Sequence, residues 1–190
     1  MKVTSTKLIT RVTTGDELPE GDFRHVAFIG RSNVGKSSVI NLIGQKKDLA
    51  KSSSTPGFTK SINFYLINKS FYLVDLPGYG YAQGSLTERK RLHALIEWYL
   101  SYPNLTDKQL IVLIVDAKVG LSKLDRQIVD LLQTLEKRVI VVANKIDKLK
   151  KNDIKKQITA IEKVCSPFAV IPFSVPSKTG LPALIKEIYG

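Results

Sequence analysis

The chain has 190 residues, of which 43% are hydrophobic and 24% are charged, and this composition excludes an intrinsically disordered protein. The 29 lysine and arginine residues outnumber the 17 acidic residues and give a net charge of +12. Such an excess is typical of proteins that meet nucleic acid or an anionic surface, although a merely solvated basic surface has the same composition. The single cysteine, Cys165, excludes an internal disulfide. Neither a secretory signal nor an apolar run of membrane-spanning length is evident, so we expect a cytoplasmic protein without membrane contacts.

Residues 1–22 predict a polar N-terminal lead-in, and residues 23–190 predict a single domain. Short apolar runs predict strands at 25–29, 62–67, 71–75, 110–116, 138–143 and 168–173. Helical patterns predict helices at 37–43, from Ser85 onward, through Leu124, Ile128, Leu131, Leu132 and Leu135, and at 182–189. The connection between the second and third strands is too short for a crossover, so that pair must be antiparallel. The order predicts an α/β fold with a mostly parallel sheet of about six strands, one antiparallel hairpin, and helices on both faces.

A glycine-rich segment lies between the first predicted strand and the first predicted helix. It matches the Walker A pattern of the P-loop NTPases and reads Gly30-Arg31-Ser32-Asn33-Val34-Gly35-Lys36-Ser37-Ser38. Glycines let the backbone curl so that its N–H groups and the positive end of the helix face phosphate oxygens. Lys36 is expected to reach the terminal phosphates, and the Ser37 hydroxyl is expected to ligate Mg²⁺. The segment predicts a phosphate-binding loop.

A second motif at the end of a predicted strand indicates which base is bound. It reads Asn144-Lys145-Ile146-Asp147. A carboxylate at Asp147 can accept hydrogen bonds from the ring N–H and the amine of guanine, whereas adenine leaves it unpaired at a cost of about 1–3 kcal/mol. Asn144 is expected to tether neighbouring loops and the Lys145 stem to lie along the purine. Phe173-Ser174-Val175 should add backbone contacts to the base, with Ser177-Lys178 as an alternative register.

Two further segments fit the parts of a GTP-dependent switch. Asp75-Leu76-Pro77-Gly78 follows a strand, so Asp75 is expected to hold Mg²⁺ through a water and the Gly78 N–H to contact the γ-phosphate. In the polar loop before the second strand, Gly57-Phe58-Thr59 is expected to touch the nucleotide, and Thr59, rather than Thr55, to complete the magnesium shell. Lys36, Asp75 and Gly78 are the predicted catalytic groups of a GTPase that converts GTP to GDP and phosphate.

The residue after Gly78 is unusual. Many GTPases have glutamine there to orient the attacking water, and this chain has Tyr79. We therefore expect slow intrinsic hydrolysis, with the missing group supplied by a partner, a potassium ion or another side chain. A turnover rate typical of an efficient stand-alone enzyme would contradict this.

Taken in order, these motifs closely resemble the EngB (YihA/YsxC) family of small bacterial GTPases, in the TrmE–Era–EngA–EngB group. The resemblance rests on residues 30–38, Thr55-Pro56-Gly57-x-Thr59, Ile62-Asn63-Phe64 and Asp75-Leu76-Pro77-Gly78-Tyr79-Gly80-Tyr81-Ala82. It implies a G domain that acts as a molecular switch in assembly of the large ribosomal subunit and is needed for normal cell division and septation. It also implies a large-subunit precursor, with its rRNA and proteins, as the partner; we expect a monomer. Phe58 and Lys60 depart from the family's usual residues.

Some interpretations stay open. By resemblance to related GTPases, Asn33 is a candidate potassium ligand, although a loop asparagine can equally bond its own backbone. Residues 145–151 with Lys155 and Lys156 form either an RNA-facing patch or a solvated helix face. Rival functions are a related GTPase acting on tRNA modification or small-subunit assembly, a nucleotide-binding module without turnover, and a small-molecule kinase.

Overall fold

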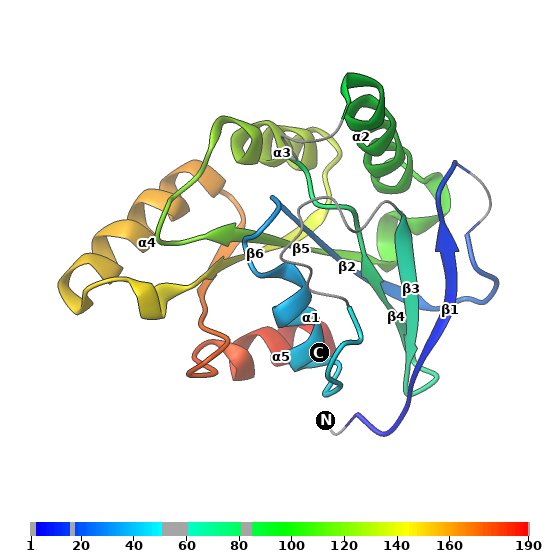
Figure 1. Cartoon of the computed structure of the whole chain (residues 1–190), viewed down its shortest axis with the longest axis horizontal. Helices are drawn as coiled ribbons and strands as arrows, with labels where there is room; N and C mark the ends of the chain where they lie inside the picture. The colour runs from blue at the N-terminus through cyan, green and yellow to red at the C-terminus, as the bar shows by residue number, and fades with distance from the viewer. Residues whose placement is uncertain (1–2, 16–17, 51–60, 81–84, 190) are drawn as a thin grey trace.

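The computed structural model describes residues 3–15, 18–50, 61–80 and 85–189. In this part of the chain, seven strands form one sheet in the order β1-β3-β4-β2-β5-β6-β7 (Figure 1). The strands are β1 (Thr6–Val12), β2 (Arg24–Gly30), β3 (Ile62–Ile67), β4 (Phe71–Asp75), β5 (Gln109–Asp116), β6 (Arg138–Asn144) and β7 (Ala169–Pro172). β4, β2, β5, β6 and β7 run parallel, and β3 is antiparallel to both of its neighbours. The predicted α/β fold is confirmed.

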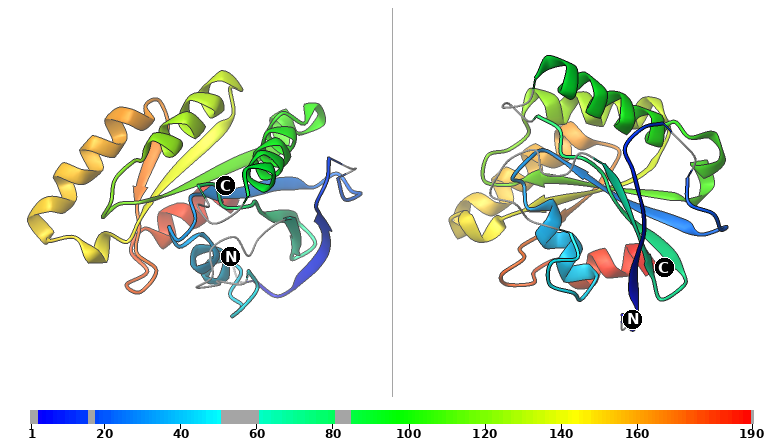
Figure 2. Two further views of the ribbon diagram at one scale, coloured as in Figure 1. Left: turned by 45° about the horizontal axis from the view of Figure 1, so that its top comes forward. Right: turned by 45° about the vertical axis from the view of Figure 1, so that its right-hand side comes forward.

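Helices cover both faces of this sheet (Figure 2). They are α1 (Lys36–Ile43), α2 (Leu86–Leu100), α3 (Lys123–Thr134), α4 (Lys151–Cys165) and α5 (Leu181–Tyr189), with short 3-10 helices at Pro103–Lys108 and Ile146–Lys148. α1 and α5 pack on one face, and α2, α3 and α4 pack on the other, each against its own hydrophobic cluster. The strands buried on both faces read as continuous apolar runs for this reason. None of the helices in the described ranges has the length and apolar character that a membrane crossing requires.

The strand β1 lies within the segment that the sequence predicts as a polar lead-in. It pairs antiparallel with β3 at one edge of the sheet. The apolar pattern is weak because an edge strand buries little, and its Leu8 and Ile9 side chains are each 38% exposed. The sheet therefore has seven strands rather than about six, and it contains a second antiparallel pair.

The buried stripe of α3 differs from the predicted one at its start. The periodicity places Leu124 on the buried face, but Leu124 is 42% exposed. The buried residues are Asp125, Ile128, Val129 and Leu132. The prediction for Leu124 is thus wrong, because a carboxylate takes the inward position of the first turn, with partners described below.

His25 lies on β2 in an aromatic cluster beneath α2. Its side chain is 2% exposed, with the rings of Phe64 and Tyr72 in edge contact at centroid separations of 5.8 and 5.3 Å. The Nδ1 atom lies 3.1 Å from the Tyr99 hydroxyl. Burial disfavours the charged imidazolium and lowers the pKa of His25 to about 4.

The unfolded chain binds a proton at His25 near pH 6.5, whereas the folded chain does so only near pH 4, so acid favours unfolding. The contribution of His25 to stability is present above pH 6.5 and is lost as the pH falls toward 4. Urea titrations should show the free energy of unfolding falling by on the order of 2–3 kcal/mol over this pH range because of His25. His25→Phe should flatten the pH dependence, and His93→Gln, at an exposed histidine, should leave it unchanged. Equal slopes for His25→Phe and the wild type would contradict the assignment.

Candidate nucleotide-binding site

The glycine-rich loop connects the carboxyl end of β2 to the start of α1. Gly30 is the last residue of β2, and Lys36 is the first of α1. A Cβ on Gly30 would lie 2.6 Å from the Ile114 carbonyl oxygen, and one on Gly35 would lie 2.4 Å from Asn144 Nδ2. Gly35 also has φ of 96°, which L side chains rarely adopt. These glycines let the loop pass close to β5 and β6 on its way into the first turn of α1, whose N-terminal end is the positive end of the helix.

The loop is joined to the end of β4 by an ion pair. The Lys36 ammonium donates to Asp75 Oδ1, and both side chains are almost completely buried. Asn63 Nδ2 lies 3.4 Å from Asp75 Oδ2. The Leu76 amide donates to the Phe28 carbonyl at 3.1 Å and continues the β2–β4 pairing beyond the strand. Two motifs far apart in the sequence thus meet where the parallel strands β2 and β4 reach their carboxyl ends.

The chain after Asp75 runs along the phosphate loop. The Ser32 amide donates to the Tyr79 carbonyl at 3.0 Å, and the Tyr79 amide donates to the Gly30 carbonyl at 3.3 Å. A Cβ on Gly78 would lie only 3.2 Å from Ser32 Oγ. Gly78 is therefore placed directly beside the loop, where the sequence predicts that its amide meets the γ-phosphate.

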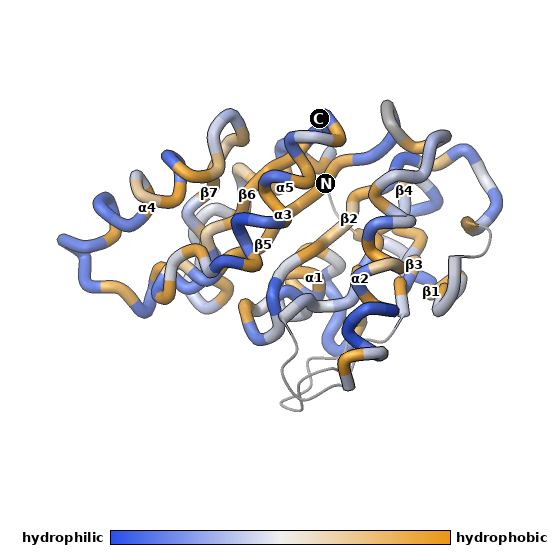
Figure 3. Tube along the Cα trace, turned by 90° about the horizontal axis from the view of Figure 1, so that it is seen from above, coloured by the Kyte–Doolittle hydropathy of each residue, from blue (hydrophilic) through white to orange (hydrophobic). Residues whose placement is uncertain are grey.

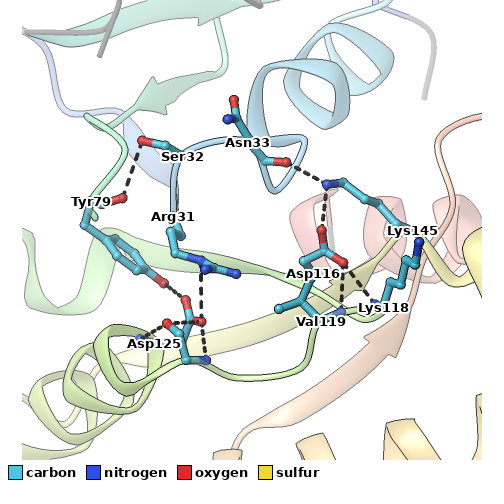
Figure 4. Close-up of polar contacts among 10 residues, drawn as sticks. Arg31, Ser32, Asn33, Tyr79, Asp116, Lys118, Val119, Asp125 and Lys145 are labelled. Atoms are coloured by element: carbon cyan, nitrogen blue, oxygen red, sulfur yellow. Dashed lines mark hydrogen bonds and ion pairs between the residues drawn. The ribbon is translucent and has the colours of Figure 1, made fainter. Parts of the chain in front are cut away.

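The base-recognition motif is tied to the same loop from the opposite side (Figure 4). Asn144, 2% exposed at the end of β6, donates from Nδ2 to the Val34 carbonyl at 2.8 Å. Lys145 Nζ donates to the Asn33 carbonyl and to Asp116 Oδ2, each at 2.6 Å. The predicted tether between loops is therefore present, and Lys145 shares it.

The last predicted contact segment lies beside Asp147. Ser174 Oγ donates to Asp147 Oδ1 at 2.7 Å. The Phe173 amide donates to the Ala143 carbonyl at 2.9 Å, and the Phe173 carbonyl accepts from the Ile146 amide at 3.2 Å. Ser177 bonds to Ser174 Oγ through its amide at 3.4 Å. These contacts place Ser174 beside Asp147, and Phe173-Ser174-Val175 as the base-contacting register stays a prediction.

Other predicted residues are placed with less detail. Arg31, Ser32, Asn33 and Val34 form the loop, and Ser37 and Ser38 lie in the first turn of α1. Leu76 and Pro77 are buried, Leu76 in the hydrophobic cluster under α2, α3 and α4. Asn33 has φ of 68°, a left-handed conformation that asparagine tolerates, so it has a backbone reason to be in the loop. Gly57, Phe58 and Thr59, with Thr55, lie outside the described residues.

Asp116 is a residue of the site that the sequence motifs did not predict. It ends β5, is 7% exposed, and accepts from the Lys118 and Val119 amides at 2.9 and 3.3 Å through Oδ1, while Oδ2 receives Lys145. A carboxylate at the end of a fully buried strand is a signal that could have found it, because such ends gather at the ligand-binding edge of a parallel sheet.

Comparisons with known proteins agree with this geometry. A family model described as "50S ribosome-binding GTPase" matches residues 25–145, and one described as the elongation factor Tu GTP-binding domain matches residues 104–189. The probable GTP-binding protein EngB of Kosmotoga olearia is 40% identical over 189 residues, with 98% of each chain covered. That of Clostridium perfringens strain SM101 is 38% identical over 192 residues, covering all of this chain and 96% of the relative. The chain belongs to the EngB family of GTP-binding proteins.

Solved structures extend the likeness to three dimensions. The crystal structure of a probable EngB protein matches with a TM-score of 0.72 at 26% identity, covering 87% of this chain and 96% of that one. Era, solved in complex with MgGDPNP and a segment of 16S ribosomal RNA, matches with a TM-score of 0.70 at 26% identity over 87% of this chain and 55% of that one. As an EngB-family G domain, the chain binds GTP and GDP and hydrolyses GTP.

Proposed function

We propose that this EngB-family GTPase is a GTP-dependent switch in the assembly of the large ribosomal subunit, needed for normal division and septation, and that it works in the cytoplasm as a monomer. The observation that carries the switch is the direct contact of the strand-end segment Asp75–Tyr79 with the phosphate loop. A segment in that position gains or loses a contact when the γ-phosphate is present or absent. The description of the matched family model supports the ribosomal partner.

In this proposal each described motif has one task. Lys36 and the loop amides bind the phosphates, Asp147 accepts from guanine while it is held by the Ser174 hydroxyl, and the Gly78 amide senses the γ-phosphate. Asn144 and Lys145 keep the base side of the site in register with the loop. Because these contacts hold the loops in place before binding, little ordering remains to be done when the nucleotide enters.

The donors present suit magnesium. The Ser37 hydroxyl is a hard oxygen ligand, the Asp75 carboxylate can hold a water on the ion, and the contact with Lys36 places Asp75 at the phosphate loop. In the described ranges there is no group of three or more His, Cys, Asp or Glu side chains able to hold a metal by itself. Mg²⁺ at this site would therefore also be held by the nucleotide phosphates, and Thr59 would add a ligand. Bound there, the ion would neutralise charge on the phosphates.

The proposed partner surface is a group of lysines around the start of α4, which we name the α4 lysine cluster. Its members are Lys148, Lys150, Lys151, Lys155 and Lys156, all exposed. Asp153 is the one carboxylate among residues 148–156. Within the described chain, no carboxylate lies within 4.0 Å of any of these ammonium groups. α4 lies at the opposite end of the molecule from β1 and has hydrophilic turns (Figure 3). Such a surface suits the phosphate backbone of rRNA.

Co-sedimentation with large-subunit precursors under GTP, GDP and no nucleotide tests the switch. We expect binding to be strongest with a GTP analogue, because only then is the Gly78 segment held by a γ-phosphate. Equal binding in all three conditions would overturn the proposal. Phosphate release stimulated by ribosomes, and absent in Lys36→Ala, would exclude a binding module without turnover.

The α4 lysine cluster has a matched control on α2. Lys155→Gln/Lys156→Gln and Arg89→Gln/Lys90→Gln each remove two exposed positive charges. We expect only the first pair to weaken ribosomal binding, and to reduce the slope of log K against log salt by about two. Nucleotide affinity, followed with fluorescent GDP, should not change in either variant. Equal weakening by the two pairs would mean that net charge rather than this cluster drives binding.

A further inference from the structure

Asp125 is the buried carboxylate of α3, and it is contacted by the N-cap residue of its own helix and by two other segments of the chain (Figure 4). Its Oδ1 accepts from the Tyr79 hydroxyl at 2.6 Å. Its Oδ2 accepts from the Ser122 amide at 2.7 Å and from the Ser122 hydroxyl at 2.6 Å. Arg31 of the phosphate loop has its Nε 4.0 Å from Oδ2. At 1% exposure, Asp125 thus connects α3, the phosphate loop and the segment after Gly78.

The contact with Tyr79 is of a strong kind. A hydroxyl bonded to a carboxylate at 2.5–2.7 Å is a charge-assisted hydrogen bond, and burial of both groups strengthens it. Burial raises the pKa of Tyr79 well above its usual value, and the charge of Asp125 raises it further. The hydroxyl therefore keeps its proton and remains a donor at neutral pH.

The same tyrosine is held at its backbone by the phosphate loop. Its amide and carbonyl bond to Gly30 and Ser32, while its side chain points to α3 (Figure 4). Tyr79 is thus bonded to the phosphate loop through its backbone and to α3 through its hydroxyl, and Gly78 is the residue directly before it. This also gives the tyrosine a role that is unrelated to the water-orienting glutamine found there in many GTPases.

We propose that Asp125 is a positioning residue, which through the Tyr79 hydroxyl sets the Gly78 amide for the γ-phosphate and links γ-phosphate recognition to α3. The proposal rests on the proposed role of Gly78 as the γ-phosphate sensor. It assigns to α3 a part in distinguishing GTP from GDP, although α3 supplies none of the predicted nucleotide contacts. In this proposal the buried carboxylate of Asp125 positions Gly78 through Tyr79 and also caps the start of α3.

The test compares Tyr79→Phe, Asp125→Asn and the double variant. Affinities for fluorescent GDP and for a non-hydrolysable GTP analogue are measured with Mg²⁺ present. We expect each single variant to bind the GTP analogue about tenfold more weakly, with GDP affinity within about twofold of wild type. Both substitutions break the same linkage. The double variant should therefore lose no more affinity for the GTP analogue than the single variant with the larger loss. Equal losses for GDP and GTP, no loss, or multiplied losses in the double variant would overturn the proposal.

Two controls separate positioning from simple destabilisation. Tyr99→Phe also removes a buried tyrosine hydroxyl, the one beside His25, and Ser122→Ala removes the capping hydroxyl but leaves Tyr79 on Asp125. Both should lower the melting temperature without changing the ratio of GTP to GDP affinity. A changed ratio in Tyr99→Phe would show that destabilisation alone produces the effect and would overturn the proposal.

Gly78→Ala separates failure of this proposal from failure of the site assignment. Its Cβ would crowd Ser32 Oγ and displace the amide, so we expect it to reduce GTP-analogue affinity selectively. If Gly78→Ala has this effect and the Tyr79 and Asp125 variants do not, only the link to α3 is wrong. If none of the three variants changes the ratio, Gly78 is not the γ-phosphate sensor and both proposals fail.

Discussion

Replacing Lys36 with methionine will weaken GTP and GDP binding by more than about a hundredfold, because Lys36 is the one lysine of the loop from Gly30 to Ser38 and is predicted to reach the phosphates. The same change should destabilise the nucleotide-free protein. Asp75 is 1% exposed and pairs with Lys36, so methionine leaves a buried carboxylate without its cation. Breaking a buried pair in this way costs about 3–5 kcal/mol. Urea unfolding measures the stability, and fluorescent GDP measures the binding.

The double variant Lys36→Met/Asp75→Asn separates the two effects. Its amide carries no charge and can still accept from Asn63, so much of the lost stability should return while nucleotide binding does not. A single variant that is fully stable would contradict the buried ion pair. A double variant that regains both stability and binding would contradict the role of Lys36 at the phosphates.

Replacing Asp147 with asparagine will reduce GTP affinity by about a hundredfold or more, because an amide cannot accept from both donors on the guanine edge. The amide can instead donate to the oxygen that xanthine carries where guanine has its amine, and accept from the ring N–H. We therefore expect the variant to gain affinity for XTP as it loses affinity for GTP. Ser174 can still donate to the side-chain oxygen, so the loop itself should persist.

Competition of fluorescent GDP with GTP, XTP and ATP measures this change. Asp153→Asn is the matched control, since it makes the same substitution at an exposed carboxylate six residues further along. The control should retain the wild-type order of affinities. Unchanged GTP affinity in Asp147→Asn would show that the base is recognised elsewhere.

Much of the site could be predicted from the sequence, because the residues of each motif lie close together along the chain. The phosphate loop carries its glycines, lysine and hydroxyl within a few residues, and the strand before it and the helix after it are visible in the apolar pattern. Asp75 and Asn144 end buried strands, so parallel pairing alone brings them to one edge. The boundaries of β3 and β4 were predicted correctly for a similar reason, since a three-residue connection leaves little freedom.

The motifs, the nucleotide that they suit and the class of fold can therefore be derived from the order of the residues alone. Which residues contact one another is visible only in the packed chain. There β1 takes the edge of the sheet, Lys145 bonds to Asp116 across 29 residues, and Tyr79 bonds to Asp125 across 46. Periodicity wrongly places Leu124 on the buried face of α3 and cannot place Asp125 there, because a carboxylate is buried only where donors from other segments meet it. Hydrogen bonds between remote side chains leave no spacing in the sequence, so only the packed chain reveals them.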